Sequence, residues 1–438
     1  MRTALQAVRD LGVRLDDAAH DDDGLAALAQ DRQFVLLGEA THGTAEFYRM
    51  RARITLRLIA EHGFDAVAVE GDWPDAWAVH RCVTLQSGPD PVQALAGFER
   101  FPVWMWRNRE VAALVRALRA HNAPLPPERR AGFYGLDLYS LYRSADDVVR
   151  YLRGVDPEAA EAARHRYEAL DHVRDAQSYG YQAAMRMRPS AQAAVRRQLD
   201  ELRQAGAGYL RADGVRALDA QFAAERNAAA VVNGETYYRA MFGARDETWN
   251  LRDAHMRDTL FALSAHRRRL GGSGRVVVWA HNSHLGDARA TEMGARGEWN
   301  LGQLVRQAAG ERALLVGFTT YAGTVSAAAD WDGEVERMRV RPALADSWER
   351  LFHESRLDRF FLPLHGAAAA PLRATRLERA IGVIYRPQTE RASHYFGAAL
   401  GQQFDAVFHL DETSALEPLQ APAHWHAAEA PETLPSGR

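Results

Sequence analysis

The sequence predicts an α/β fold, in which a mainly parallel central sheet is flanked by helices and a helical lobe is inserted in the middle of the chain. Short, continuous apolar segments rich in β-branched residues recur along the chain, and amphipathic segments separate most of them. This alternation is typical of a parallel sheet that is covered on both faces. Between about residues 145 and 259, in contrast, the sequence contains no convincing strand.

Seven segments are predicted as strands, because each is a short apolar run that ends in polar or turn-forming residues. Strands of a parallel sheet are buried on both faces, so they show runs of apolar residues and little alternation. The segments are 34–39 (FVLLGE), 66–73 (AVAVEGDW), 132–139 (GFYGLDLY), 275–284 (RVVVWAHNSH), 313–321 (ALLVGFTTY), 380–387 (AIGVIYRP) and 405–412 (DAVFHLDE).

The clearest helical pattern lies in the segment 46–63. Phe47, Ile54 and Leu58 recur there at helical spacing, and Gly63 is suited to end the helix. The segment VAALVRALRAHN repeats the pattern after the next predicted strand. Three Ala-, Arg- and Glu-rich stretches predict the helices of the inserted lobe, namely 158–173, 190–205 and 214–232.

These elements divide the chain into three parts. We expect residues 1–144 and 260–416 to form the α/β catalytic core, and residues 145–259 to form the helical lobe. Residues 417–438 are rich in Pro and Ala and are predicted to be a flexible tail. The sequence leaves open whether the lobe covers the site or is only structural.

Composition excludes several classes of protein. The chain has 438 residues, of which 47% are hydrophobic, enough for one large domain or two ordinary ones. Its 54 basic and 57 acidic residues give a net charge of −3, which provides no basic surface for nucleic acid. The longest apolar runs are too short to span a membrane, and the first residues lack the apolar core of a secretory signal. We therefore expect a cytoplasmic protein that binds neither nucleic acid nor a membrane.

The single cysteine, Cys82, excludes an intrachain disulfide. It lies in the segment WAVHRCVTL, which is predicted to be a helix. That setting favours a buried small side chain over a nucleophile.

Ionisable side chains follow four of the predicted strands, at the point where each strand ends. In open parallel sheets, ligands bind outside the carboxyl ends of the strands. Four strands that deliver such groups to one edge therefore predict a functional site there. The residues are Glu39, His42, Glu70, Asp72, Asp137, His281 and His284.

Each of these residues alone also has a structural interpretation. Glu39 and Asp72 could stabilise the starts of the helices that follow them. Asp137 could order a turn, and His281 and His284 could form hydrogen bonds within the core. Two ionisable groups directly after an apolar strand are costly unless they are used, which favours function for the set as a whole.

The set offers two kinds of chemistry. Imidazole nitrogens and carboxylate oxygens could bind zinc or manganese, although neither HExxH nor another established ligand motif is present. Without a metal, a neutral histidine can take a proton from water while a carboxylate fixes its tautomer and stabilises the imidazolium. A second histidine or an arginine would then stabilise the oxyanion. There is no GxSxG segment for a serine nucleophile, and nothing marks Ser283 as activated.

Arginines and tryptophans near these segments are further candidates. Arg49, Arg51 and Arg53 lie on the helix after His42, where at most one or two can face the site. Four tryptophans could form the walls of a pocket for a bulky organic substrate, although tryptophan is more often part of a core. These are Trp73, Trp77, Trp104 and Trp106.

Eight stretches of the chain closely resemble the erythromycin esterase family. They occur in the expected order between residues 36 and about 413, so the resemblance covers nearly the whole chain. The stretches are LLGEATHGTAEFYRMRARI, AVEGDWPDA, RFPVWMWRN, YGLDLYSL, WNLRDAHM, WAHNSHLGDAR, GVIYRPQTERASHYFG and FDAVFHLDET.

The resemblance implies an α/β fold with a helical lobe and a deep cleft between them, and hydrolysis of a lactone ester. The general-base histidine of the family matches His42, and its active-site carboxylates match Glu39 and Glu70. The family's arginine matches Arg51, and its second histidine pair matches His281 and His284. Members of the family are regarded as using histidine-activated water, with no fixed cofactor and no obligatory metal.

We therefore expect an esterase or lactonase that needs no cofactor and acts on a small molecule. His42 would be the general base, supported by Glu39 or Glu70, and His281, His284 and Arg51 would bind the carbonyl oxygen or the oxyanion. Substrate binding is assigned to Asp72, Trp73, Trp106 and Asp137. Two alternatives stay open, a biosynthetic lyase or cyclase that uses the same histidine as a base, and a binder of a bulky hydrophobic molecule.

Overall fold

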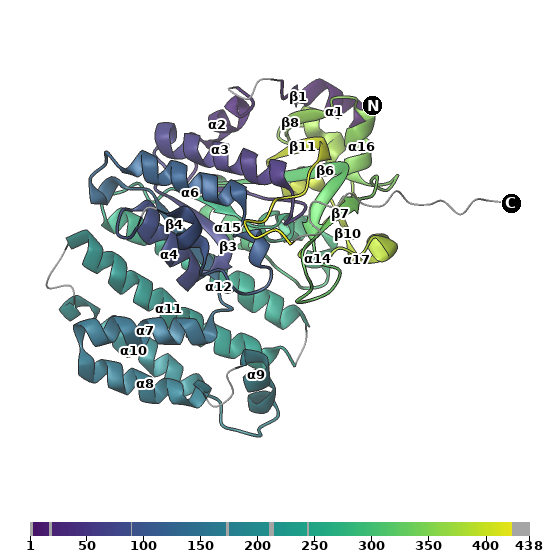
Figure 1. The fold of residues 1–438 in the computed structure, drawn as a ribbon. Helices are drawn as coiled ribbons and strands as arrows, with labels where there is room; N and C mark the ends of the chain where they lie inside the picture. The colour runs from purple at the N-terminus through teal and green to yellow at the C-terminus, as the bar shows by residue number, and fades with distance from the viewer. Residues whose placement is uncertain are drawn as a thin grey trace.

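The computed structural model describes residues 3–16, 20–88, 90–171, 175–209, 214–242 and 245–422. Figure 1 shows a twisted sheet with helices on both faces and, below it in this view, a separate group of helices. This architecture confirms the predicted α/β fold with a helical insertion.

Within the described residues, the main sheet has the strand order β1-β8-β11-β6-β2-β5-β3-β4, and β7 pairs with β6. All pairs from β11 to β4 along this order are parallel, whereas β8, β1 and β7 join by antiparallel pairs. A separate antiparallel pair consists of β9 (Arg376–Arg379) and β10 (Tyr395–Ala398). The strands of the main sheet are β1 (Val13–Arg14), β2 (Phe34–Leu37), β3 (Ala66–Asp72), β4 (Gly132–Asp137), β5 (Val276–Trp279), β6 (Ala313–Ala327), β7 (Glu336–Val340), β8 (Arg359–Pro363) and β11 (Ala406–Thr413).

All but one of the predicted strand segments contain a strand of this sheet. The prediction for 380–387 is wrong, because this segment makes only isolated bridges, at Ile381 and Ile384. Ile381 and Tyr385 are buried against side chains of β6 and β7, so the apolar run reflects burial and not strand pairing. The short edge strand β1 and its neighbour β8 were not predicted.

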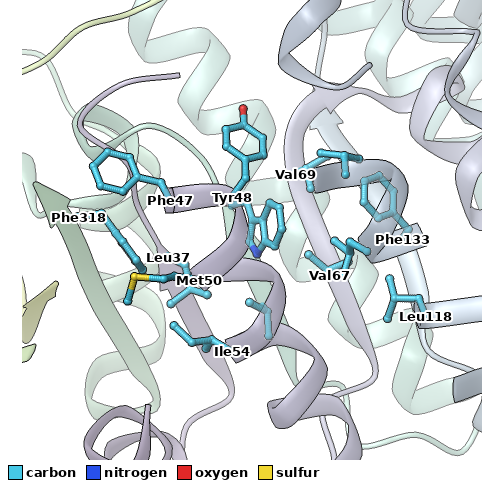
Figure 2. Close-up of a cluster of buried hydrophobic side chains, with 14 of the residues drawn as sticks. Leu37, Phe47, Tyr48, Met50, Ile54, Val67, Val69, Leu118, Phe133 and Phe318 are labelled. Carbon is cyan, nitrogen blue, oxygen red and sulfur yellow. The ribbon is translucent and has the colours of Figure 1, made fainter. Parts of the chain in front are cut away.

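Alternate residues of the central strands face two different hydrophobic clusters, as the pleat of a strand requires. Val35 and Leu37 of β2 belong to one cluster, and Phe34 and Leu36 belong to the other. Figure 2 shows the first cluster, in which Phe47, Tyr48 and Ile54 of α3 pack against β2 and β3. The helices of this face are α2 (Asp23–Ala29), α3 (Ala45–His62), α4 (Trp73–Val83), α5 (Pro91–Leu95) and α6 (Arg109–Asn122).

The second cluster covers the opposite face of the sheet. Its helices are α1 (Ala4–Leu11), α12 (Arg245–Arg269), α13 (Asn282–Leu285), α15 (Leu301–Ala309), α16 (Trp348–Glu354) and α18 (Leu400–Gln403). The short helices α14 (Glu292–Ala295) and α17 (Glu390–Ser393) lie in the connections between them. Both faces of the parallel strands are therefore buried, which explains their continuous apolar sequence.

Two local predictions are confirmed. The predicted helix after His42 forms as α3, and Gly63 ends it with a φ of 68°, a left-handed conformation that glycine adopts without strain. Cys82 is fully buried within α4, as expected for a small packing residue.

The inserted helices form a hydrophobic cluster of their own. It contains residues of α7 (Leu141–Val155), α8 (Pro157–Asp171), α9 (Ala176–Ala184), α10 (Gln192–Tyr209) and α11 (Gly214–Ala240). Two helices also reach the cluster of the sheet: α11 contributes Phe222 and Ala223, and the next helix, α12, contributes Met256, Leu260 and Leu263. The domain limits at 144/145 and 259/260 stay predictions.

The predicted tail begins against the core, where the backbone N–H of Leu419 donates to the carbonyl oxygen of Arg107. Residues 423–438 of this tail lie outside the described residues. No helix in the described part of the chain is both long enough and apolar enough to cross a membrane.

Candidate active site

A cleft of about 420 Å³ lies at the carboxyl ends of β2, β3, β4 and β5. Its walls include most of the residues that the sequence places after these strands, namely His42, Glu70, Asp72, Asp137, His281 and His284. A larger cavity of about 580 Å³ lies beside β6 and β7, but no histidine lines it. The chemistry predicted from the strand ends is therefore gathered in the smaller cleft.

His42 follows β2, and its imidazole is bonded to the protein through Nδ1. Its Nδ1 lies 3.0 Å from Oε1 of Glu39, and Arg51 donates a hydrogen bond to the other oxygen of the same carboxylate. The guanidinium of Arg51 lies over the rings of Tyr48 and Trp279, at 4.5 and 4.6 Å. Glu39 and Arg51 are fully buried, whereas the ring of His42 reaches the cleft.

This arrangement fixes the tautomer of His42. A carboxylate that accepts from Nδ1–H leaves the lone pair of His42 on Nε2. Within the described residues, Nε2 forms no hydrogen bond with the protein. The imidazole can therefore take a proton from a molecule in the cleft.

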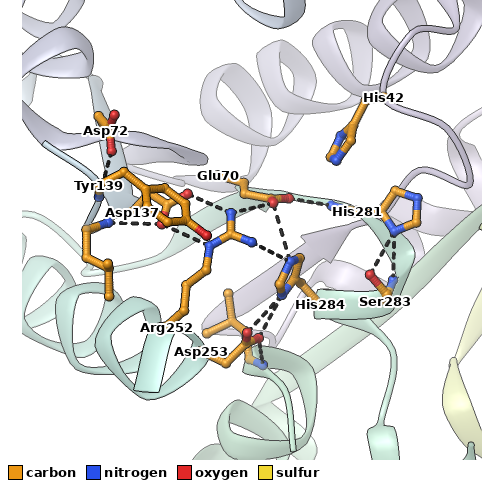
Figure 3. A network of polar contacts seen from close by, with 12 residues as sticks. His42, Glu70, Asp72, Asp137, Tyr139, Arg252, Asp253, His281, Ser283 and His284 are labelled. Carbon is orange, nitrogen blue, oxygen red and sulfur yellow. Dashed lines mark hydrogen bonds and ion pairs between the residues drawn. The ribbon is translucent and has the colours of Figure 1, made fainter. Parts of the chain in front are cut away.

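Glu70 lies near the carboxyl end of β3, beside both histidine segments (Figure 3). Its Oε2 accepts a hydrogen bond of 2.9 Å from the backbone N–H of His281, and its Oε1 accepts one of 2.7 Å from Arg252. Burial raises the pKa of this carboxyl, but His284, Arg252 and His42 outweigh burial and lower it well below its usual value. Glu70 is therefore an anion at neutral pH.

His281 is held in a neutral form. Its Nε2 donates to the carbonyl oxygen of Ala40 at 3.2 Å, and its Nδ1 accepts from the backbone N–H of Ser283, also at 3.2 Å. Burial, followed by the charge of His42, lowers the pKa of His281 to about 3. Both of its nitrogens are thus used within the protein, although its ring lies 4.9 Å from that of His42.

His284 is surrounded by three residues of α12. Its Nδ1 lies 2.9 Å from both carboxylate oxygens of Asp253, and Trp249 stacks on the ring at 4.3 Å. Its Nε2 lies 3.0 Å from Arg252 and 3.4 Å from Oε1 of Glu70. Burial lowers the pKa of His284, but Asp253 and Glu70 outweigh burial, so the net shift is upward.

Arg252 connects the ends of three strands (Figure 3). It donates two hydrogen bonds to Asp137, from Nε at 3.0 Å and from Nη2 at 2.6 Å. The same guanidinium donates to Glu70 and contacts His284, and it lies 5.0 Å from the ring of Tyr139. Neither Arg252 nor Asp253 was selected from the sequence, because both belong to a helix in the region assigned to the lobe.

The outer part of the cleft is also acidic. Asp72 accepts from Arg100 at 3.0 Å and from the backbone N–H of Tyr139 at 3.0 Å, and its burial raises its pKa. Asp75, one turn further on, forms an ion pair with Arg143, and burial raises its pKa to about 7. Asp72 therefore lines the cleft, and its contact with a substrate stays a prediction.

Three predicted site residues, Glu39, Arg51 and Trp73, do not line the cleft, and Glu39 contacts it only through His42. Trp73 is buried in the core against Tyr134 and Phe222, so its expected contact with the substrate is not found. Arg51 lies behind Glu39 and cannot bind a substrate carbonyl. Trp106, in contrast, lines the cleft as predicted.

Aromatic residues from outside the predicted set complete the walls. Phe98, Phe101, Tyr139, Trp249 and Trp331 all line the cleft. Phe101 and Trp331 come from loops far apart in the sequence, and their rings lie 5.0 Å apart. Phe101 lies in the family-resembling stretch RFPVWMWRN, whereas no sequence pattern marked Trp331, which stands in a loop without periodicity.

The donor set fits a resident metal ion poorly. Both nitrogens of His281 and both oxygens of Glu70 are occupied by hydrogen bonds within the protein. The cation of Arg252 lies between the carboxylates of Glu70 and Asp137. Among the described residues, no group of three or more His, Cys, Asp or Glu side chains is arranged to hold a metal.

Comparison with known sequences agrees with the resemblance seen in the sequence. The erythromycin esterase family model matches residues 59–413. The protein YbfO of Bacillus subtilis (strain 168), whose name assigns it provisionally to the hydrolases, is 25% identical over 138 residues. That match covers 31% of this chain and 29% of YbfO, so this chain matches less than a third of the length of that relative.

Solved structures share the fold over nearly the whole chain. A Bacillus cereus protein superposes with a TM-score of 0.79 at 20% identity, covering 95% of this chain and 98% of the other. A protein described as a succinoglycan biosynthesis protein gives 0.76 at 21%, with 94% and 97% covered. A mutant of the erythromycin esterase EreC in its open conformation gives 0.66 at 16%, also with 94% and 97% covered. At these identities the likeness shows the fold alone.

Proposed function

The chain belongs to the erythromycin esterase family, and from this premise we propose that it cleaves a carboxylic ester or a lactone, such as a macrolactone, with water activated by His42. The family and the partial match to YbfO support hydrolase activity. The bond that is cleaved and the role of His42 are our proposal, as is the absence of a cofactor.

The observation that carries this proposal is the state of His42. Its Nδ1 is bound to the buried Glu39, and its Nε2 faces the cleft without a protein partner among the described residues. A general base needs a free lone pair within reach of the proton that it removes. Among the imidazoles that line the cleft, His281 and His284 have both nitrogens in contact with protein groups.

In the proposed reaction, Nε2 of His42 takes a proton from water while the water oxygen forms a bond to the carbonyl carbon. The carbonyl π electrons move to the oxygen, which becomes the oxyanion. When the oxyanion collapses, the bond to the alkoxide oxygen breaks, and the imidazolium returns its proton to that oxygen. The products are a carboxylic acid and an alcohol, which in a lactone remain one molecule.

Two carboxylates stabilise the charges of this cycle. Glu39 accepts from Nδ1–H and Glu70 lies beside His42, so both favour the imidazolium that forms. His284 has a raised pKa and lines the same cleft; because both of its nitrogens contact protein groups, we assign it to stabilising the oxyanion by its positive charge and not by a direct hydrogen bond. His281 is assigned a structural role, because Ala40 and Ser283 occupy its nitrogens.

The test is mass spectrometry of the purified chain incubated with a panel of macrolactones, simple lactones and linear esters. A product that carries one added water in the wild type, and that is lost in His42→Gln, supports the proposal. A product without added water would instead indicate a lyase or cyclase that uses the same base. Tight binding without any product would indicate a binding protein.

A further inference from the structure

The guanidinium of Arg252 forms polar contacts with three residues of the candidate site. Its Nε and Nη2 hold Asp137, its Nη2 also holds Glu70, and its Nη1 lies 3.0 Å from His284. Asp137 and Glu70 lie at the carboxyl ends of β4 and β3, and His284 follows β5; the three strands are neighbours in the sheet. One guanidinium from α12 therefore holds side chains at the carboxyl ends of three neighbouring strands.

The charge of Glu70 depends on this guanidinium together with His284 and His42. Groups from several elements face the Glu70 carboxylate, and within the described residues Arg252 is the arginine that bonds to it. Asp137 adds a second negative charge on the far side of Arg252. The groups that face Glu70 are Arg252 of α12, His284 of α13, His281 before α13, His42 before α3, Tyr48 of α3 and Asp137 of β4.

We infer that Arg252 is a positioning residue of the proposed reaction, which keeps Glu70 ionised and oriented beside His42 by bridging it to Asp137 and His284. This inference rests on the proposed function for its effect on catalysis. Arg252 acts through Glu70, whose negative charge stabilises the imidazolium of His42. The arrangement parallels that of Arg51, which holds Glu39 on the other side of the same histidine.

The physical reason lies in the cost of a buried, unpaired carboxylate. Glu70 and Asp137 are both almost fully buried, and without Arg252 two like charges would be left without their shared cation. A buried carboxyl then takes up a proton, because burial disfavours its charged form. A protonated Glu70 no longer stabilises positive charge on His42.

The first test compares Arg252→Met and Arg252→Lys by the pH dependence of kcat/KM. In Arg252→Met we expect kcat to fall about 100-fold, the size of effect produced by a misplaced catalytic group. We also expect the acid limb of the profile to move to higher pH. Arg252→Lys keeps the cation and should keep the limb in place.

A uniform loss at every pH, or full activity, would overturn the inference. Arg257→Met on the same helix, outside the cleft, is the matched control.

A double-mutant cycle tests whether Arg252 acts through Glu70. If it does, adding Arg252→Met to Glu70→Gln costs much less activity than adding it to the wild type, because the two residues form one unit. Equal losses in both backgrounds would show that Arg252 acts independently of Glu70, against the inference.

An infrared measurement tests the ionisation without any turnover. Burial raises the pKa of Glu378 to about 8, so the wild type already contains a protonated carboxyl at neutral pH. In the difference spectrum against the wild type, Arg252→Met should gain an additional carbonyl band of a protonated carboxyl, which the double variant R252M/E70Q should not gain. No new band in Arg252→Met, or a band that survives in R252M/E70Q, overturns the inference. Absence of turnover by the wild type would count against the proposed function alone. If Arg252→Met does not fold, R252M/D137N removes one carboxylate together with the cation and allows the same measurement.

Discussion

Glu39 and His42 are three positions apart in the chain and are joined by one hydrogen bond, with 3.0 Å between Oε1 of Glu39 and Nδ1 of His42. A single turn between β2 and α3 places both residues, so their geometry does not depend on distant parts of the fold. Arg51, two turns into α3, bonds to the second carboxylate oxygen and holds the carboxylate in place. The proposed base and the carboxylate that supports it therefore form a unit built from one short segment.

Loss of His42 should abolish hydrolysis and leave the fold intact. In His42→Gln we expect turnover to fall by about 10²–10⁴-fold, the usual contribution of a positioned general base. The side chain reaches the cleft, so circular dichroism and the thermal midpoint should change little. His165→Gln, an exposed histidine of the lobe, is the control and should keep full activity. Retained turnover in His42→Gln would exclude this residue as the base.

Arg51 should matter more for stability than any of its neighbours on α3. Arg51→Met leaves the carboxylate of Glu39 buried and without its cation, which we expect to cost about 3–5 kcal/mol of unfolding free energy. Arg49 is 55% exposed, and Arg49→Ala should cost less than about 1 kcal/mol. Urea unfolding of the two variants measures the difference. Equal midpoints would mean that the Glu39–Arg51 pair contributes little.

The strand ends explain why so much of the site can be predicted from sequence. Glu39, Glu70, Asp137 and His281 each directly follow an apolar run, and parallel strands bring such positions together at one edge. The family resemblance assigns roles only in outline. The structure separates His42, whose Nε2 has no protein partner among the described residues, from His281, whose nitrogens both form hydrogen bonds.

The contributions of helices and loops could not be predicted in the same way. Arg252 and Asp253 lie on α12, far along the chain from the strands whose residues they hold, and periodicity shows only which face of a helix is apolar. Trp73 directly follows a strand, as the catalytic residues do, but it turns into the core. The segment 380–387 was predicted as a strand because it is apolar, and instead part of it lines the cleft.

Buried histidines should make the fold sensitive to mild acid. Burial lowers the pKa of His255 from 6.5 to about 4, and it lowers the pKa of His80 and His266 as well. Below about pH 6.5 the unfolded chain binds protons that the folded chain does not, so stability falls as the pH drops towards 4. Each such histidine lowers the free energy of unfolding by up to about 1.4 kcal/mol for each pH unit of this fall.

Urea unfolding between about pH 4 and 6.5 measures how steeply the free energy of unfolding changes with pH. His255→Gln should reduce this slope by the contribution of one proton. The contact of His255 with Asn233, at 2.8 Å, can be replaced in part by the glutamine amide. An unchanged slope would mean that His255 does not titrate differently in the folded and unfolded chains.

Removal of divalent metal should leave turnover unchanged. The oxygens of Glu70 and the nitrogens of His281 already form hydrogen bonds within the protein, and Arg252 places a cation beside the same carboxylate. Dialysis against a chelator, followed by the hydrolysis assay, checks this expectation. Loss of activity that zinc or manganese restores would support the metal-dependent alternative instead.

The pair of Phe101 and Trp331 should set the preference for substrate size. Trp331 is 57% exposed, yet it lines the cleft and its ring lies 5.0 Å from that of Phe101, so the two loops meet at the outer part of the cleft. An aromatic contact of this kind contributes about 0.5–1.5 kcal/mol, or roughly a 2–12-fold change in an equilibrium constant. In Trp331→Ala we expect the KM of a bulky ester to rise by about that factor, while kcat and the KM of a methyl ester change little. Tyr181→Ala, an exposed aromatic residue of the lobe, is the control. Equal effects on large and small esters would show that Trp331 supports the loop and does not contact the substrate.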